Sequence, residues 1–274
     1  MEKQTVDIAA IATQALNILG TGKQIALFSS RYPELGLDDA WRVTALARQM
    51  RASRGERPIG RKIGFTNRTI WAEYGVYAPI WGYLFDRTVH DLGEIGGRFS
   101  LAGLAEPRIE PEIVFGLAAA PTPGMDEHAL LSCIDWVAHG FEIVQSIYRG
   151  WKFTAADTII ANGLHGALLV GERHPVTPHA AEWARTLSTF EIDLLQNGSL
   201  ADHGRAADVL DGPLSALRHL VELLASDICN PPLAAGEIIT TGTLTRALPV
   251  AAGETWSTAL AGVAIGGISA RFEG

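Results

Sequence analysis

The spacing of hydrophobic residues predicts that the chain begins with helices. From Val6 to Leu19, apolar residues recur at the intervals of one helix face, and Gly20 is a suitable stop. A second helix is predicted from Asp38 to Arg54, with Asp38 as its N-cap. The basic stretch 51-RASRGERPIGRK-62 comes next, and we expect it to be a solvated helix end followed by a loop.

After Lys62 the pattern changes, because short apolar runs alternate with glycine and proline, as is typical of strands and turns. The predicted strands are 62–66, 79–85, 109–117, 141–146, 163–171, 189–196, 237–241 and 264–272. Helices are predicted over 125–138, capped by Asp126, and over 213–225. We therefore expect an α+β fold in one domain over 1–274, with a helical portion over 1–60 and a β-rich body over 61–274.

The composition narrows the classes of protein. Hydrophobic residues make up 47% of the 274 residues and charged residues 19%, which indicates a compact globular chain. A net charge of -8 argues against nucleic acid and against an anionic membrane as main partners, because both need clustered lysine and arginine. The first twenty residues lack the order of a secretory signal, and no apolar run has the length of a membrane span. We expect a cytoplasmic protein.

Two carboxylates stand out in the apolar segment 108-RIEPEIVFGL-117. Side chains two apart on a strand share a face, so Glu110 and Glu112 should lie side by side, where like charges repel and resist burial. Glu142 lies on a later predicted strand that can return beside them. Three carboxylates suit a hard divalent cation, and the alternative is an exposed strand face with solvated charges.

Several separated segments, taken in order, resemble one family. They are 61-RKIGFT-66, 75-GVYAPIWGYLF-85, 108-RIEPEIVFGL-117, 141-FEIVQS-146, 157-DTIIAN-162, 211-DGPLSAL-217, 238-IITTG-242 and 266-GGISARF-272. Together they resemble the fumarylacetoacetate hydrolase superfamily. Within it, they are similar to the branch of 2-hydroxypenta-2,4-dienoate (2-keto-4-pentenoate) hydratases and 4-oxalocrotonate decarboxylases of aromatic catabolism.

The resemblance implies a mixed β-roll with a helical N-terminal portion, assembled as a homo-oligomer. It implies that Glu110, Glu112 and Glu142 hold Mg²⁺ or Mn²⁺ and that Lys62 is catalytic. The other residues that we expect in the site are His165 as a catalytic group and, for substrate binding, Asn162, Thr241, Gly242 and Arg246.

The implied activity is that of a metal-dependent lyase on a small 2-oxo or 2-enol carboxylate. Hydration of a 2-hydroxypenta-2,4-dienoate-like acid is the main interpretation. Decarboxylation of a 4-oxalocrotonate-like acid is the alternative. A further alternative is hydrolysis of a carbon–carbon bond in a 2,4-dioxo acid, with His165 as the base.

This chain departs from the family pattern at two places. Tyr77 and Ile80 stand where the hydratases carry acids, and 79-PIWG-82 is more typical of the decarboxylases. In 161-ANGLHG-166, His165 replaces a small serine or cysteine. His165 is either a general acid or base in the pocket or a residue that fills space, and both interpretations stay open. Arg246 likewise either binds a carboxylate or is a solvated loop arginine.

Overall fold

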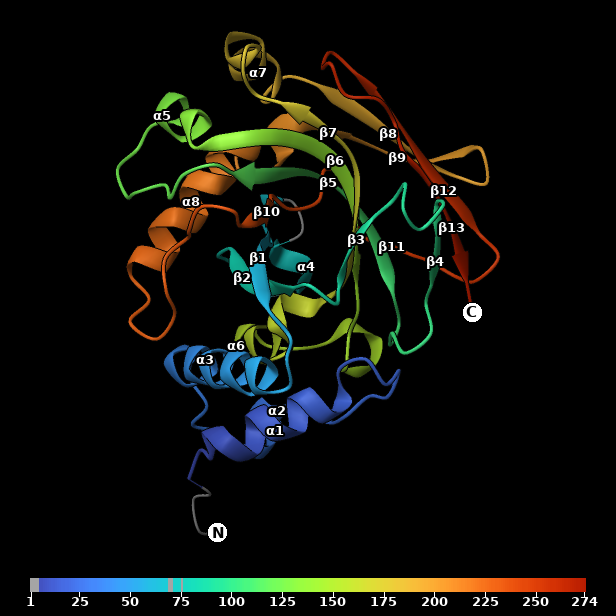
Figure 1. The fold of residues 1–274 in the computed structure, drawn as a ribbon. Coiled ribbons are helices and arrows are strands. Elements are labelled where there is room, and N and C mark those ends of the chain that lie inside the picture. Colours follow the sequence, from blue (N-terminus) through green and yellow to red (C-terminus); the bar gives the residue numbers. More distant parts are fainter. Residues whose placement is uncertain (1–4, 69–70, 75) are drawn as a thin grey trace.

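A strongly curled sheet is the central feature of the computed structural model, which describes residues 5–68, 71–74 and 76–274 (Figure 1). Gly75, the first residue of the segment 75–85, lies outside them. Among the described residues the strand order is β2–β1–β10–β5–β6–β7–β3, with β11 beside β5. The strands are β1 (Pro58–Gly64), β2 (Ile80–Phe85), β3 (Val89–Asp91), β5 (Arg108–Leu117), β6 (Ile134–Val144), β7 (His165–Pro175), β10 (Ile238–Thr240) and β11 (Leu248–Pro249).

A second sheet covers one face of the first. Its order is β4–β13–β12–β8–β9, and it lies to the right in Figure 1. Its strands are β4 (Arg98–Ser100), β8 (Glu191–Gln196), β9 (Ser199–Arg205), β12 (Thr255–Ala261) and β13 (Ser269–Glu273). Ile109 and Phe141 of the large sheet share a buried cluster with Trp256 and Phe272. Because side chains alternate along a strand, Glu110 and Glu142, which directly follow Ile109 and Phe141, point to the opposite face of the large sheet.

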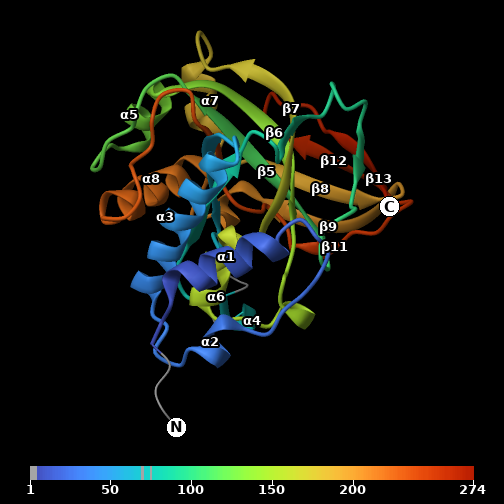
Figure 2. The ribbon, with the colours of Figure 1, turned by 60° about the horizontal axis from the view of Figure 1, so that its bottom comes forward.

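Helices cover the rest of the large sheet. They are α1 (Ile8–Ile18), α2 (Phe28–Arg31), α3 (Leu37–Ser53), α4 (Trp71–Tyr74), α5 (Glu127–Ser132), α6 (Ala155–Ile160), α7 (Ala180–Thr186) and α8 (Pro213–Ala225), with 3₁₀ turns η2 (Arg149–Trp151), η3 (Asn162–Leu164) and η4 (Ala206–Asp208). Helices α1, α2, α3 and α6 form one group, at the bottom of Figure 1 and nearer the viewer in Figure 2. Helix α8 buries Leu214, Leu217 and Leu220 in the main core.

The predicted class is confirmed, since a helical N-terminal portion leads into a curled sheet that is mixed. Strands β1 and β10 are parallel, whereas β5 and β6 are antiparallel. Helix α8 begins and ends where the pattern predicts it, and α1 lies within its predicted range.

Four local predictions are wrong, and the first is the strand over 264–272, which begins only at Ser269. Asp38 lies in the first turn of α3, and Gly36 is the N-cap. Asp126 does cap α5, but that helix ends at Ser132, because pairing of β6 with β5 and β7 outweighs the local helical pattern of residues 134–138. Arg61, expected in a solvated stretch, is buried, with its guanidinium 3.9 Å from the centre of the Tyr83 ring.

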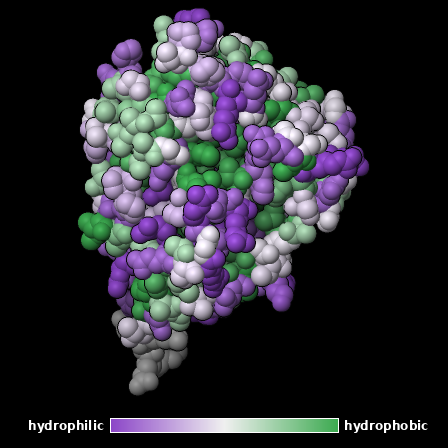
Figure 3. All heavy atoms as spheres, viewed as in Figure 1, coloured by the Kyte–Doolittle hydropathy of each residue, from purple (hydrophilic) through white to green (hydrophobic). Residues whose placement is uncertain are grey.

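Charged and apolar residues share the surface. On the face seen in Figure 1, hydrophilic residues are widespread and a group of hydrophobic ones lies near the centre (Figure 3). Within the described ranges, the exposed large hydrophobic side chains are Leu37, Tyr77, Leu200 and Ile228. No helix among these residues has the length and apolar character that a membrane crossing requires.

Replacing Asp157 by alanine should lower the free energy of unfolding by about 2–4 kcal/mol, because four hydrogen bonds that its buried carboxylate accepts would be lost. Its buried carboxylate accepts from the backbone N–H and hydroxyl of Ser29, at 3.1 and 2.6 Å, and from those of Thr154, at 3.2 and 2.8 Å. Urea unfolding measures the change. Asp126→Ala, at an exposed helix cap, is the control and should cost about 1 kcal/mol. An equal loss in the two variants would contradict this role for Asp157.

Candidate metal centre and active site

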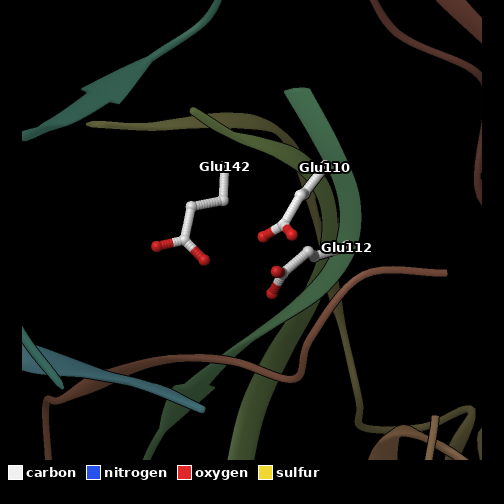
Figure 4. Close-up of side chains that lie close together, drawn as sticks. All are labelled: Glu110, Glu112 and Glu142. Carbon is white, nitrogen blue, oxygen red and sulfur yellow. The ribbon is translucent and has the colours of Figure 1, made fainter. Parts of the chain in front are cut away.

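The three predicted carboxylates converge. Strands β5 and β6 pair so that Glu110 lies opposite Glu142, and Glu112 follows two residues along the same face. One oxygen from each group lies within 4.8 Å of the others. Figure 4 shows the three carboxylates turned toward a common space. Glu112 and Glu142 have no solvent exposure, so the alternative of an exposed strand face is wrong.

Each of the two fully buried carboxylates has one oxygen bound and one without a hydrogen-bond partner. Oε2 of Glu112 accepts from the backbone N–H of Gly242 at 2.8 Å, and Oε1 of Glu142 lies 2.7 Å from Nδ1 of His165. Their other oxygens, Glu112 Oε1 and Glu142 Oε2, form no hydrogen bond. Buried carboxylate oxygens need compensation, and oxygen ligands are what Mg²⁺ and Mn²⁺ prefer. The residues therefore fit a divalent cation.

Lys62 contributes a positive charge to this cluster. It is buried on β1, donates to the Gly163 carbonyl at 3.0 Å, and lies 3.3 Å from Oε2 of Glu142. Burial alone would lower the pKa of Lys62, but the neighbouring carboxylates outweigh burial and raise it. Lys62 therefore stays protonated at neutral pH.

One lysine does not neutralise three acids, and their pKa values reflect this. Burial raises the pKa of Glu110 to about 7. Burial, with the charges of Glu142 and Glu110, raises the pKa of Glu112 well above its ordinary value. Burial also acts to raise the pKa of Glu142, but Lys62 and His165 outweigh it and lower that pKa. Without a cation, Glu142 therefore ionises most readily and Glu112 least readily, and full ionisation of all three carboxylates requires further positive charge.

A cavity next to Lys62 and Glu110 has apolar walls. The side chains of Phe65, Trp151 and Phe153 line it, and Phe153 meets the rings of Phe65 and Trp151 edge-on, at 6.5 and 6.2 Å. Of the lining residues in the described chain, Lys62 is the only cation and Glu110 the only acid. The cavity thus suits a small molecule with an anionic end and an apolar remainder.

Asn162 acts on the site through the backbone. Its side-chain oxygen accepts from the Tyr83 N–H at 2.8 Å, and its amide donates to the Tyr83 carbonyl at 2.9 Å. Both polar atoms of the side chain are thereby engaged with β2. This fastens η3 next to β1 and places the Gly163 carbonyl that accepts from Lys62.

The loop after β10 contributes a backbone group and not a side chain. Gly242 has a φ of 95°, and a Cβ there would collide with the Thr66 hydroxyl, so glycine is required where the N–H meets Glu112. The Thr241 hydroxyl donates to the Ile113 carbonyl at 3.0 Å. Arg246, whose side chain is 66% exposed, pairs with Asp202 at 3.1 Å. Of these predicted residues, only Gly242 directly contacts a carboxylate of the centre in the structure.

His165 lies behind Glu142 and not in the cavity that Lys62 lines. Nδ1 of the buried ring meets Glu142, and Nε2 meets the Thr88 hydroxyl at 2.9 Å. The ring lines a separate cavity of about 240 Å³, together with Arg51 and Thr88, which shares no lining residue with the first. Both ring nitrogens of His165 are therefore engaged by groups of the protein, outside the cavity that Lys62 lines. Sequence reasoning missed Thr88, which lies in a turn without a motif.

His139 holds the strand that carries Glu112. Its ring is buried between Glu112, whose carbonyl lies 2.9 Å from Nδ1, and the Thr258 hydroxyl, 3.0 Å from Nε2. Burial lowers the pKa of His139 to about 4, so the ring is neutral. It joins the two sheets directly behind the carboxylate cluster.

No protein-family model matches the chain, but curated proteins match nearly its whole length. It is 31% identical to the 2-hydroxyhexa-2,4-dienoate hydratase of Comamonas testosteroni, over 89% of this chain and 90% of the relative. It is 30% identical to the 2-keto-4-pentenoate hydratase of Paraburkholderia xenovorans, over 96% and 94%. It is also 30% identical to a 4-oxalocrotonate decarboxylase of Pseudomonas putida, over 97% and 96%.

Solved structures agree. The 4-oxalocrotonate decarboxylase of Pseudomonas putida G7, complexed with magnesium and adipate, superposes with a TM-score of 0.87 at 29% identity, over 98% of this chain and 99% of that one. The fumarylpyruvate hydrolase of Pseudomonas aeruginosa, in complex with Mn²⁺ and pyruvate, has a TM-score of 0.53 at 13% identity, over 78% and 89%. The latter likeness shows the fold alone.

Proposed function

The chain belongs to the family of 2-keto-4-pentenoate hydratases and 4-oxalocrotonate decarboxylases, within the fumarylacetoacetate hydrolase superfamily, and on that basis we propose that it hydrates a 2-hydroxypenta-2,4-dienoate-like acid. It is a metal-dependent lyase whose cofactor is a divalent cation, as the magnesium and calcium complexes of the similar decarboxylase support, and we propose Mg²⁺ or Mn²⁺. Glu110, Glu112 and Glu142 would hold the cation, as their convergence and unpartnered oxygens support. The role that we propose for it is in the catabolism of aromatic compounds.

The groups around the cavity would have different roles in the reaction. The bound cation would supply Lewis-acid stabilisation of negative charge on the acid's carboxylate end. Lys62 adds a fixed positive charge at the same end, where charge develops as the dienol becomes an enolate. A proton added at the far carbon of the dienol produces a conjugated enone, to which water then adds. The aromatic walls hold the far end of the molecule.

The apolar wall of the cavity is the observation that supports hydration rather than decarboxylation. A 4-oxalocrotonate-like acid has a second carboxylate at its far end, and a buried carboxylate needs a partner. Lys62 lies at the carboxylate cluster, and no other cation lines the cavity within the described ranges. An uncharged far end meets Phe65, Trp151 and Phe153 without that penalty.

Two observations favour decarboxylation as the second candidate. The segment 79-PIWG-82 is more typical of the decarboxylases. The decarboxylase structure that superposes with a TM-score of 0.87 contains adipate, which is a dicarboxylate. Carbon–carbon hydrolysis has no such support. It needs His165 as a base in the cavity, and both of its ring nitrogens are engaged elsewhere.

Turnover of two 2-hydroxy-2,4-dienoates, one ending in a methyl group and one in a carboxylate, tests the proposal. We expect kcat/KM to be about a hundredfold higher for the methyl-terminated acid, because the carboxylate would be buried without a partner. Hydration is followed by loss of dienoate absorbance, and product by NMR. EDTA should abolish turnover, and Mg²⁺ or Mn²⁺ should restore it.

Release of CO₂ from the dicarboxylic acid without hydration would establish the decarboxylase instead. Absence of turnover with either acid, under conditions where the cation is bound, would refute the lyase assignment.

We also propose that residues 1–274 act as one catalytic domain. Trp41 of α3 stacks on Trp81 of β2, with ring centres 4.8 Å apart, so the N-terminal helices pack directly on a strand next to Lys62. Homo-oligomer assembly, a cytoplasmic location and the absence of nucleic-acid or membrane partners stay predictions from the sequence.

A further inference from the structure

We propose that His165 is a positioning residue for the metal centre, which orients Glu142 so that Oε2 is the oxygen available to the cation. The inference rests on the proposed centre and concerns a residue with no direct access to the substrate cavity. The two contacts of the ring carry it, at 2.7 Å to Glu142 and 2.9 Å to Thr88.

The direction of the first hydrogen bond follows from the chemistry of the two groups. An ionised carboxylate only accepts, so Nδ1 of His165 carries the hydrogen that meets Oε1 of Glu142. The Thr88 hydroxyl at Nε2 holds the other side of the ring, and so fixes its plane. Glu142 therefore cannot rotate its carboxylate without breaking a buried hydrogen bond.

A β-bulge places the ring on this side of the sheet. Ile143 on β6 pairs with Ala167, but Val144 pairs with His165, one residue further than a regular ladder allows. A one-residue shift reverses the face of a side chain, so His165 shares the face of Glu142. Gly166 permits the shift, because a Cβ there would lie 2.6 Å from the Ile143 carbonyl oxygen.

Each fully buried carboxylate thus has one hydrogen-bond donor that the fold holds in place. Gly242 occupies one oxygen of Glu112, and His165 occupies one oxygen of Glu142. In each case the opposite oxygen has no hydrogen bond, and that of Glu142 lies 3.3 Å from the Lys62 ammonium, whose charge a cation would face as well. Each group is thereby held with a single oxygen available, which fixes the cation's ligands before it binds.

Titration of Mn²⁺ into the metal-free protein, without substrate, tests the inference. His165→Ala should weaken Mn²⁺ binding about tenfold or more, as loss of a residue that orients a ligand does. Imidazole in the buffer should restore part of the affinity, because the 240 Å³ cavity adjoins the vacated position. His165→Asn should retain more affinity than alanine, since its amide nitrogen can replace Nδ1. Thr88→Val should cause a smaller loss of about threefold.

A matched control exists in the same chain. His203 pairs with Asp193 at the same Nδ1–carboxylate distance of 2.7 Å, but both side chains are nearly half exposed. His203→Ala should leave Mn²⁺ affinity unchanged. Circular dichroism confirms that each variant is folded.

Each result decides the question. A folded His165→Ala that binds Mn²⁺ within about twofold of the parent overturns the inference. Lost turnover with unchanged Mn²⁺ affinity also overturns it, because His165 would then act on substrate. Should the alanine variant not fold, Thr88→Val and His165→Asn decide, and parental affinity in Thr88→Val contradicts the role. Glu112→Gln distinguishes failure of this inference from failure of the proposed metal centre. Undiminished Mn²⁺ binding by that variant would show that the carboxylates do not form a metal centre.

Discussion

Replacing Glu112 by glutamine should abolish the binding of Mg²⁺ and Mn²⁺ and reduce turnover by about a thousandfold or more. The amide keeps the shape of the side chain, but it removes the charge of a fully buried group whose Oε1 has no hydrogen-bond partner. The Gly242 N–H can still donate to an amide oxygen. The loss should therefore be specific to the cation.

The same substitution should not destabilise the metal-free protein. Glu112 lies beside Glu110 and Glu142, and burial together with their charges raises its pKa well above the ordinary value. A neutral amide relieves that repulsion, so the unfolding temperature without metal should stay the same or rise. The increase that Mn²⁺ causes in the parent should disappear.

Calorimetric titration and thermal unfolding, each with and without Mn²⁺, measure both effects. Glu94→Gln, at an exposed position, is the matched control and should behave like the parent. Undiminished Mn²⁺ binding by the Glu112 variant would show that these carboxylates do not form the metal centre.

Replacing Lys62 by methionine should reduce kcat/KM by about a hundredfold or more while metal binding is retained. Lys62 is the only cation among the residues that line the substrate cavity in the described chain, and methionine has nearly its length without its charge. Because Lys62 lies 3.3 Å from Glu142, its removal also removes a charge that competes with the cation. Mn²⁺ should consequently bind as tightly as in the parent, or more tightly.

This pattern is the opposite of the one expected for Glu112, so the two variants distinguish a catalytic charge from a metal ligand. Steady-state kinetics and Mn²⁺ titration on the same preparations provide the comparison. Lys23→Met, on the exposed surface, controls for the loss of one positive charge. An unchanged kcat/KM in Lys62→Met would assign Lys62 a purely structural part.

The local sequence pattern predicts which face of a strand a residue occupies better than it predicts which segments pair with each other. Alternation along β5 predicts that Glu110 and Glu112 share a face, and the structure confirms it. The same kind of reasoning extends a helix to residue 138, although β6 begins at Ile134. That strand pairs with β5 and β7, which lie on both sides of it in space, and these distant contacts override the local preference.

The sequence by itself determined the fold class and the shared face of Glu110 and Glu112, because both depend on a periodic pattern. The catalytic part of Lys62 rests on a resemblance to a family and stays a prediction. Only the tertiary structure decided which groups His165 contacts. Its face depends on a bulge between β6 and β7, and its second contact is Thr88, in a turn 77 positions earlier in the chain. A periodicity describes one strand at a time, whereas register and bulges arise from contacts between strands that are distant in sequence.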